Sequence, residues 1–284
     1  MAEALLQVEG LSFQYRTGTD PAVSGLTTTV GGGEVLLIAG PSGCGKSTLL
    51  RCVNGLIPRS YRGELAGRVT VDGHHVAGLS LARLARLVGT VLQDPEKQIV
   101  ASYVAEEVAF GPENLGWPRE RILAAVEAAL EELGIGHLRG RETYRLSGGE
   151  KQKVALAGLL AMEPRVLLLD EPLASLDPMA ARHALEVIRD QARAGRAVVV
   201  VEHRVDDVLA IGPERAMLLH EGRQLYNGAA AGLAAAADPP LVKLPTTWSS
   251  PFKCARPMAT SSFSRRSVLG NTVGSRPFSP RYIA

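Results

Sequence analysis

Hydrophobic and polar positions alternate along the first thirty residues of the chain. The segment ALLQVEGLSFQY, residues 4–15, follows this pattern and predicts a strand, and the turn RTGTD separates it from a second strand over Val23–Val30. The segment GRVTVDG, residues 67–73, predicts a further strand that ends in an Asp-Gly turn. We therefore expect the beginning of the chain to be built of strands joined by turns.

Three later segments each contain a continuous apolar run, as in strands that are covered on both faces. They are EVLLIA (34–39), RVLLLDE (165–171) and RAVVVVEH (196–203). Helices are expected from Lys46 to about Gly55 and from Met179 to Ala194, and RAMLLHEGRQLYNG (215–228) predicts a hairpin with a Glu-Gly turn. Because strands and helices alternate, the pattern indicates an α/β fold with a largely parallel sheet.

The segment from Gln93 to Leu160 has a different character, rich in alanine and glutamate, and predicts a mostly helical block. Pro118 precedes one of its helices, and just before the block Ser80 can cap a short helix over LARLARLV (81–88). After Ala237 no helix or strand pattern remains. The Ser/Pro/Arg-rich tail, residues 238–284, is expected to be disordered or adventitious; the alternative is a segment that folds on a partner.

Composition adds few constraints. Hydrophobic residues make up 46% of the 284, charged residues 21% and aromatic residues only 5%, so the core should consist mostly of leucine, valine and alanine. The net charge of +2 arises in the tail, because the body before Pro240 carries 24 basic and 29 acidic residues, and a body with net negative charge does not indicate nucleic-acid binding. The three cysteines match neither a disulfide framework nor a metal site.

Neither a signal peptide nor a membrane span is expected from the sequence. The first ten residues, MAEALLQVEG, lack the basic-then-apolar signal pattern. No apolar run approaches the roughly 18 residues that a transmembrane helix needs. The chain is therefore expected in the cytosol unless another component holds it at a membrane.

The segment GPSGCGKST fits the phosphate-binding loop pattern G-x-x-x-x-G-K-[ST] and lies between a predicted strand and a predicted helix. Its glycines allow backbone N–H groups to turn toward phosphate oxygens, Lys46 supplies a mobile charge to the β- and γ-phosphates, and Ser47 offers a hydroxyl to Mg²⁺. The nucleotide-binding residues predicted here are Gly40, Pro41, Ser42, Gly43, Cys44, Gly45, Lys46, Ser47 and Thr48.

Two further segments complete the candidate chemistry. VLLLDEP places Asp170 at a strand end, where it can hold Mg²⁺ through water, and Glu171 one residue beyond, where it can polarise an attacking water. The step Ser147-Gly148-Gly149 at a helix start forms a second anion site. The alternative for Ser147 is a capping box with Glu150, and the same groups can serve both purposes.

These elements, taken in order with Gln93, SLDP and VEHR, resemble the nucleotide-binding subunit of an ABC transporter over residues 1 to about 230. The resemblance implies a P-loop NTPase of the ABC ATPase fold, with a RecA-like core, an N-terminal antiparallel β subdomain and a helical signature subdomain. It implies an ABC ATPase domain over residues 1–237, with the helical subdomain inserted at about 94–160. It also implies ATP and Mg²⁺ as cofactors.

In that family two nucleotide-binding domains meet head to tail, and this arrangement gives the second anion site a function. Ser147, Gly148 and Gly149 would bind the γ-phosphate of ATP held by the partner chain. Gln93 would sense Mg²⁺ and the attacking water, and His203 would contact the γ-phosphate and steady Glu171. The resemblance also implies that Asp177 of SLDP crosses the dimer interface and that Tyr15 stacks on adenine; for Tyr15 the alternative is an ordinary surface-strand tyrosine.

A narrower resemblance involves residues 91–118, VLQDPEKQIVASYVAEEVAFGPENLGWP, which are similar to the ATPases of energy-coupling-factor (ECF) importers of vitamins and transition-metal ions. In those proteins this segment receives the coupling helices of the transmembrane T subunit. We expect an acidic surface that suits a basic helix, formed by Glu96, Glu106, Glu107 and Glu113. The sequence departs from many relatives at VEHR, where Glu202 and Arg204 stand in place of Thr and Asp.

The sequence is thus interpreted as the ATP-hydrolysing subunit of an ECF importer, peripheral on the cytoplasmic face of the membrane. Its expected partners are a second ATPase subunit, identical or similar, a T subunit and through it a substrate-binding S subunit. Three alternatives stay open: a conventional ABC importer ATPase, a soluble ABC ATPase of DNA repair or translation, and a regulatory module that binds nucleotide without turnover. The soluble class would need a long coiled coil or a tandem cassette, and the sequence contains neither.

Overall fold

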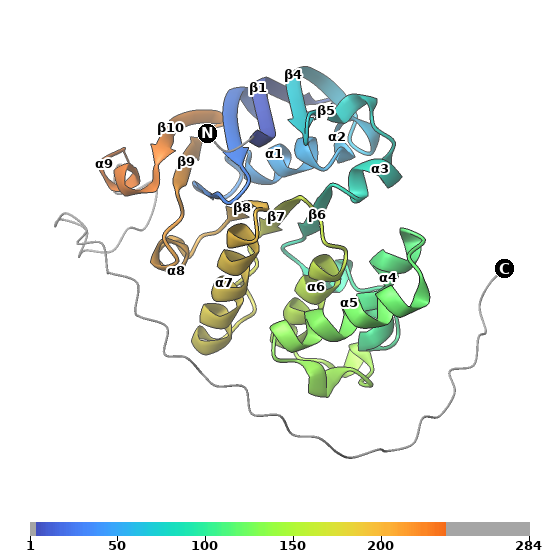
Figure 1. Ribbon diagram of the computed structural model, residues 1–284. Coiled ribbons are helices and arrows are strands. Elements are labelled where there is room, and N and C mark those ends of the chain that lie inside the picture. The colour runs from blue at the N-terminus through green and yellow to red at the C-terminus, as the bar shows by residue number, and fades with distance from the viewer. Residues whose placement is uncertain (1–3, 237–284) are drawn as a thin grey trace, which may run out of the picture. The chain divides into compact units, whose positions relative to one another are not determined.

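The computed structural model describes residues 4–236 as two β-sheets with helices packed around them (Figure 1). The predicted irregular tail, residues 238–284, and Cys254 lie outside the described residues. Within residues 4–236, no helix is both long enough and apolar enough to cross a membrane.

The smaller sheet is antiparallel and has the strand order β2-β1-β4-β5. Its strands are β1 (Ala4–Tyr15), β2 (Val23–Gly31), β4 (Gly63–Val71) and β5 (His74–His75). The first two strands confirm the prediction from the alternating pattern, whereas β4 begins earlier than predicted because Gly63 pairs with Tyr15 at the end of β1. Asp72 and Gly73 both have positive φ, 47° and 72°, which allows the tight β4–β5 turn.

The larger sheet has the strand order β10-β9-β3-β8-β7-β6. Its strands are β3 (Val35–Ala39), β6 (Val88–Val91), β7 (Val166–Asp170), β8 (Ala197–Val201), β9 (Arg215–His220) and β10 (Arg223–Ala229). Only the β9–β10 pair is antiparallel among these strands, so the predicted parallel sheet and the predicted hairpin are both confirmed. The continuous valine and leucine runs of β3, β7 and β8 are buried over their full length, as expected for central parallel strands.

The helices connect these strands. The α-helices are α1 (Lys46–Val53), α2 (Leu56–Arg59), α3 (Leu81–Ala85), α4 (Val104–Asn114), α5 (Arg119–Glu132), α6 (Gly148–Ala161), α7 (Pro178–Arg193), α8 (Val205–Ala210) and α9 (Leu233–Ala236). The short 3₁₀ helices are η1 (Val76–Gly78), η2 (Pro95–Lys97), η3 (Gly136–Leu138), η4 (Thr143–Arg145) and η5 (Ala230–Gly232).

One predicted helix is partly wrong. Ser80 does cap α3, where its hydroxyl accepts a hydrogen bond from the Arg83 amide, but the helix ends at Ala85 rather than continuing to Val88. The Leu87 carbonyl accepts hydrogen bonds from the amides of Arg165 and Val166, which draws the chain into strand β6 beside β7. The pairing of strands therefore overrides the helical pattern of LARLARLV.

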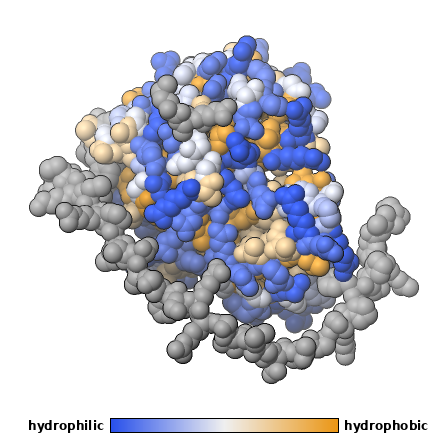
Figure 2. All heavy atoms as spheres, in the orientation of Figure 1, coloured by the Kyte–Doolittle hydropathy of each residue, from blue (hydrophilic) through white to orange (hydrophobic). Residues whose placement is uncertain are grey.

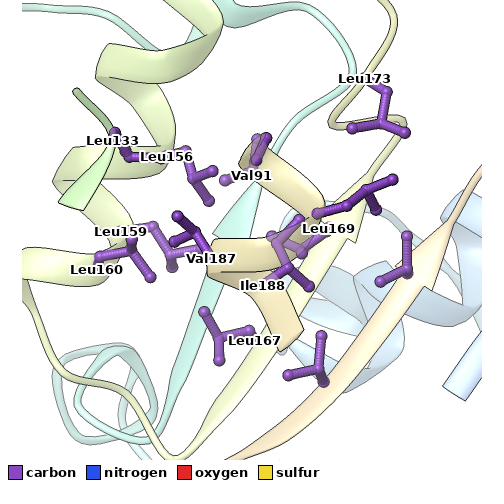
Figure 3. Packing of buried hydrophobic residues seen from close by; sticks show 14 of the residues in the cluster. Val91, Leu133, Leu156, Leu159, Leu160, Leu167, Leu169, Leu173, Val187 and Ile188 are labelled. Carbon is purple, nitrogen blue, oxygen red and sulfur yellow. The ribbon is translucent and has the colours of Figure 1, made fainter. Parts of the chain in front are cut away.

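Alternate residues of the central strands face two separate apolar clusters. In β3, Leu37 belongs to the cluster shared with α4–α8, while Leu36 and Ile38 belong to the cluster that includes α1 and the antiparallel sheet. Figure 3 shows part of the first cluster, where Leu167 and Leu169 of β7 pack near Ile188 of α7. Helix α1 is thus enclosed between the two sheets, which fixes the position of its N-terminus.

The predicted helical block forms α4, α5 and α6, which pack on one another. Helix α6 of this block packs tightly on the edge strand β6. The Leu159 side chain occupies the space that a Cβ at Gly89 would take. On the face of the molecule in Figure 2, apolar surface is divided into patches by hydrophilic residues.

Candidate functional site

The candidate site lies at the carboxyl ends of four neighbouring parallel strands. The segments that follow β3, β8, β7 and β6 begin at Gly40, Glu202, Glu171 and Leu92. Because adjacent parallel strands end at the same edge of a sheet, segments far apart in the sequence meet there. In the register of this sheet, Asp170 of β7 lies opposite Val201 of β8.

The phosphate-binding loop depends on glycine at two positions. Gly40 has φ of +147°, and a Cβ there would be 2.2 Å from the Leu219 carbonyl oxygen. Gly45 has φ of +107°, and a Cβ there would be 2.5 Å from the Ala22 carbonyl oxygen. The loop therefore fits between β9 and the chain before β2 only because these residues lack side chains.

The loop leads directly into α1, which has no side-chain cap, so the first N–H groups of this helix are available to an anion. Lys46 is only 6% exposed, and its Nζ donates hydrogen bonds to the carbonyl oxygens of Gly40 (2.8 Å) and Pro41 (2.9 Å). A buried ammonium group beside uncapped helix N–H groups is a setting that suits a phosphate chain.

Ser47 and Asp170 provide oxygen donors beside this loop. Asp170 is 9% exposed as a residue. Burial raises the pKa of its carboxyl, while the hydrogen bond from Ser47 and the charge of Lys46 act in the opposite direction. Within residues 4–236, no group of three or more His, Cys, Asp and Glu side chains could hold a metal ion. One hydroxyl and one carboxylate fit a hard cation such as Mg²⁺ that takes its remaining ligands from phosphate and water.

The structure brings Glu171 together with two other predicted residues. Gln93 Nε2 donates a hydrogen bond to Glu171 Oε2 at 2.9 Å, and His203 Nε2 lies 3.1 Å from Glu171 Oε1. Each carboxylate oxygen therefore has a partner from a different strand end. The Glu171 side chain is 16% exposed, so it is partly shielded by the chain yet still reaches solvent.

The backbone at Glu171 is unusual because its φ of 51° lies in the left-handed region. Non-glycine residues adopt this conformation at a steric cost of about 1–2 kcal/mol. The Glu171 amide donates a hydrogen bond to the Val201 carbonyl at 2.8 Å, which continues the β7–β8 pairing by one residue and holds the turn in place. Such strain is a common feature of functional positions.

Tyr15 lies at the end of β1 beside α1. Its hydroxyl is 3.1 Å from Thr48 Oγ1 and accepts a hydrogen bond from Arg51 Nη1 at 3.1 Å. Its ring packs edge-on against Phe13, with ring centroids 4.8 Å apart. Tyr15 also lines a cavity of about 430 Å³. These contacts place Tyr15 beside the phosphate-binding loop, and stacking on adenine stays a prediction.

The second predicted anion site, Ser147-Gly148-Gly149, is not hydrogen-bonded to the cluster around Glu171. Across residues 4–236, no hydrogen bond or ion pair joins them to the phosphate-binding loop or to Glu171. Ser147 forms the capping box of α6 with Glu150, so the alternative from the sequence is confirmed: the Glu150 amide donates to Ser147 Oγ and the Ser147 amide donates to Glu150 Oε2. A Cβ on Gly149 would be 3.0 Å from the Ser175 carbonyl oxygen, so the segment before Asp177 packs directly on it.

Asp177 is the N-cap of α7 and accepts hydrogen bonds from the amides of Met179 (2.9 Å) and Ala180 (3.0 Å). These amide hydrogen bonds hold the pKa of the Asp177 carboxyl below its usual value. The carboxylate therefore orders the start of a helix in its own chain, and the predicted contact across a dimer interface stays a prediction.

The prediction of surface exposure is wrong for one residue. Glu107 was expected on the acidic docking surface but is only 7% exposed, because loop 99–103 folds back over it. Its Oε2 accepts hydrogen bonds from the amides of Val100 (2.9 Å) and Ala101 (2.7 Å). Glu106 and Glu113 are exposed as expected, and Glu96 is exposed but paired with Lys151 at 2.5 Å.

The structure also adds two residues that the sequence did not place in the site, Glu202 and Arg204. Glu202 is 2% exposed beside His203, and its carboxylate accepts three backbone hydrogen bonds. The signal for Glu202 was present in the sequence, since a charged residue directly after four valines ends a fully buried strand. Its bond to the Leu173 amide could not be predicted, because Leu173 belongs to the segment that follows β7, 29 residues away in the sequence.

The parallel sheet with a glycine loop, a buried lysine and a strand-end carboxylate pair defines a P-loop nucleotide-binding protein. A family model described as ABC transporter matches residues 23–174, more than half of the chain. The chain therefore belongs to the ABC transporter family.

Relatives and solved structures agree with this assignment. A protein of Methanosarcina mazei named "Putative ABC transporter ATP-binding protein" is 39% identical over 227 residues, which cover 80% of this chain and 38% of the relative. The structure of cbiO1 from Clostridium perfringens, part of the ABC transporter complex cbiONQ, is 33% identical with a TM-score of 0.72. It covers 82% of this chain, and 91% of cbiO1 is matched. An ATP-bound bacterial Atm1-family ABC exporter is 27% identical with a TM-score of 0.69, over 84% of this chain and 41% of the exporter.

The chain spans about two fifths of the length of the curated relatives that it matches, since it covers 38%, 40% and 36% of three of them. The family membership and the α/β ABC ATPase fold confirm the corresponding predictions from the sequence.

Proposed function

We propose that this chain binds and hydrolyses ATP with Mg²⁺ and energises an ECF-type ABC importer of a vitamin or a transition-metal ion. The observation that carries the hydrolytic part is the meeting of Gln93, Glu171 and His203 at the strand ends beside Lys46 and Ser47. Bound Mg²⁺ would be held by Ser47, by Asp170 through water and by Gln93, and would neutralise charge on the phosphates.

Glu171 is proposed as the group that orients the attacking water and accepts its proton. Its two oxygens are held by Gln93 and His203, which fixes the direction of the carboxylate. His203 is 43% exposed at its side chain, so its ring can also contact a γ-phosphate at the mouth of the site. Lys46 and the first amides of α1 would hold the phosphates during this step.

A second copy of this chain, or a similar ATPase, would complete each nucleotide site. The proposal is supported by the hydrogen bonding of Ser147, which within residues 4–236 pairs with Glu150 and forms no hydrogen bond to the phosphate-binding loop. A serine at a helix start followed by two glycines can bind an anion brought by a partner. ATP would then join two chains head to tail, and hydrolysis would release them.

The ECF assignment is supported by the similarity to cbiO1 and by the surface of α4. Phe110 is 49% exposed, Tyr103 42% and Val100 64%, and Glu106 and Glu113 lie seven residues apart and so on one face of α4. A mixed apolar and acidic face suits a basic amphipathic helix of a T subunit, through which an S subunit would be reached. The chain would then be peripheral on the cytoplasmic face of the membrane.

The alternative is the ATPase of a conventional ABC importer, which would use the same chemistry with a different membrane partner. The chain purified in detergent from its own cells separates the two proposals. Recovery of a single T-type membrane protein with an S subunit supports the ECF assignment, whereas recovery of a conventional permease pair overturns it.

A Glu171→Gln variant tests the hydrolytic assignment. We expect this variant to retain ATP and form stable dimers, while the turnover number falls by about 10²–10⁴-fold, the usual contribution of a general base. The measurements are steady-state phosphate release, nucleotide binding and size-exclusion chromatography with light scattering.

The matched control is Glu163→Gln. Glu163 has the same φ of 51° but is exposed, pairs with Arg121 at 2.7 Å and lies before the start of β7, away from the carboxyl end that carries Glu171. This variant should hydrolyse ATP at the wild-type rate. Wild-type turnover by Glu171→Gln would show that another group acts as the base.

A further inference from the structure

The Glu202 carboxylate connects two segments of the site. Its Oε1 accepts a hydrogen bond from the Leu173 amide at 2.9 Å, and Leu173 lies two residues after Glu171. Its Oε2 accepts hydrogen bonds from the amides of His203 (3.0 Å) and Arg204 (3.2 Å). One buried side chain therefore holds the backbone of the segment that carries Glu171 against the backbone of the segment that carries His203.

The connection takes over where the strand pairing ends. The β7–β8 ladder runs to Asp170 opposite Val201, and the Glu171 amide adds one more hydrogen bond, to the Val201 carbonyl. Beyond that point the segments after β7 and β8 are no longer paired by backbone hydrogen bonds. The hydrogen bonds of the Glu202 carboxylate join them instead. The 3.1 Å distance between His203 Nε2 and Glu171 Oε1 lies across the same two segments.

Arg204 adds a second tie between these segments. Its Nη1 lies 3.4 Å from the carbonyl oxygens of Leu173 and Leu176, and its Nε pairs with Asp207 at 2.6 Å. Leu176 directly precedes Asp177, so the tie reaches the segment that packs under Gly149.

We propose that Glu202, supported by Arg204, is a positioning residue that sets the contact between His203 and Glu171 and thereby the rate of hydrolysis. This inference rests on the proposed ATPase function. Glu202 does not touch the reacting atoms; it acts through the two segments that it joins. It fixes the spacing of these two segments beyond the point where the pairing of β7 with β8 ends.

A Glu202→Gln variant removes this connection with little change of shape. A glutamine replaces one acceptor oxygen with an NH₂ donor, which must then face either the Leu173 amide or the amides of His203 and Arg204, all of them donors. The two segments can therefore no longer both be held. A displacement of about 1 Å at a reacting group costs up to about 100-fold in rate.

The expected result is a turnover number at least about 10-fold lower, with the KM for MgATP within about twofold of wild type, because the phosphate-binding loop is untouched. The matched control is Asp206→Asn, which removes the same charge four residues away. Asp206 is exposed, and within residues 4–236 no hydrogen bond to its side chain is formed, so this variant should behave as wild type.

A double-mutant cycle with His203→Ala separates positioning from general stabilisation. If Glu202 acts through the His203–Glu171 contact, Glu202→Gln should lower the residual single-turnover rate of His203→Ala by less than about twofold. If the two losses multiply instead, Glu202 supports the fold alone and the inference is wrong. Thermal unfolding of each variant shows whether the protein stays folded.

If Glu202→Gln does not fold, Arg204→Gln, at a partly exposed position, serves in the same cycle. It should lower turnover by at least about threefold and also show less than additive loss with His203→Ala. Wild-type turnover by either folded variant overturns the inference while the proposed function stands. Absence of ATP hydrolysis by the wild-type chain in its complex overturns the proposed function, and the inference with it.

Discussion

Burial controls the chemistry of two thiols, one in the phosphate-binding loop and one in the helix α1 that follows it. Cys44 is 3% exposed and Cys52 is 2% exposed. Burial raises the pKa of the Cys52 thiol to about 12. It also raises the pKa of the Cys44 thiol, although the charge of Lys46 acts in the opposite direction. Both groups are therefore protonated thiols at neutral pH.

Slow alkylation of these thiols is the expected consequence, because the thiolate is the reactive form. In a Cys254→Ser background, Cys44 and Cys52 should react with iodoacetamide at pH 8 at least about 100-fold more slowly in the native protein than in guanidinium chloride. Peptide mass spectrometry reports each site separately. Equal rates in the native and denatured states would show that these side chains are open to solvent.

The residues of the candidate site divide into those that local sequence predicts and those that it cannot. Asp170 and Glu171 stand at the end of a continuous apolar strand, and Lys46 belongs to a glycine-rich loop motif between a predicted strand and a predicted helix, so the places of all three could be predicted. Glu202 also follows such a strand, but its role depends on amides from a segment 29 residues away. Glu107 lies in an ordinary helical pattern, and its burial depends on a loop whose path the sequence does not specify.

Loop 99–103, which carries Val100 and Tyr103, is held by one buried carboxylate. Glu107 of α4 binds the Val100 and Ala101 amides through a single oxygen, Oε2. Thr143 supports the other side of the loop, where its hydroxyl donates to the Ala101 carbonyl at 2.7 Å. The exposed apolar residues of this region therefore stand on a well-ordered loop.

Two replacements of Glu107 should separate the loss of its hydrogen bonds to the loop amides from the loss of its charge. Glu107→Ala leaves two amides without partners and should lower the free energy of unfolding by about 1–3 kcal/mol. Glu107→Gln keeps one carbonyl oxygen that can accept both hydrogen bonds, so its loss should stay below about 1 kcal/mol. Urea unfolding measures both values, and a larger loss for glutamine than for alanine would contradict this account.

Most elements could be predicted from the sequence because their patterns agree with their burial. Strands β3, β7 and β8 are short, apolar and central, and α7 begins at Pro178 after a capping aspartate. Strand β6 could not be predicted, since Val88–Val91 directly follows a helical pattern and is ordered by pairing with β7. The short helices α2 and α8 were missed for a different reason, because four and six residues carry too little pattern.

At the scale of the molecule, the two predicted anion sites are found in different parts of one chain. The phosphate-binding loop lies against the sheet, and Ser147 starts a helix of the α4–α6 block. In the proposed head-to-tail dimer each nucleotide uses the loop of one chain and Ser147 of the other. Two chains with different defects should therefore be able to repair each other.

Mixing two inactive variants tests this arrangement. Ser147→Arg blocks the second anion site, and Glu171→Gln removes the proposed base, so each variant alone should lose nearly all turnover. An equal mixture should regain about one quarter of the wild-type activity, because half of randomly formed dimers are mixed and each contains one intact site. The measurement is phosphate release after mixing and incubation without ATP.

Two controls make the result specific. Ser80→Arg alters another serine that caps a helix and should leave turnover intact, although it loses a similar N-cap hydrogen bond. Ser147→Arg alone, at the total protein concentration of the mixture, should stay inactive. If the mixture of the two variants also stays inactive while both form dimers, each nucleotide site belongs to a single chain.

The left-handed backbone conformation at Glu171 carries a steric cost at the residue that is proposed as the base. Glycine adopts this conformation without the steric penalty that a glutamate bears. Glycine would relieve this steric cost, but it would also remove the contacts of the Glu171 carboxylate with Gln93 and His203. Replacement of this one residue by glycine would therefore leave a relaxed turn without the proposed base.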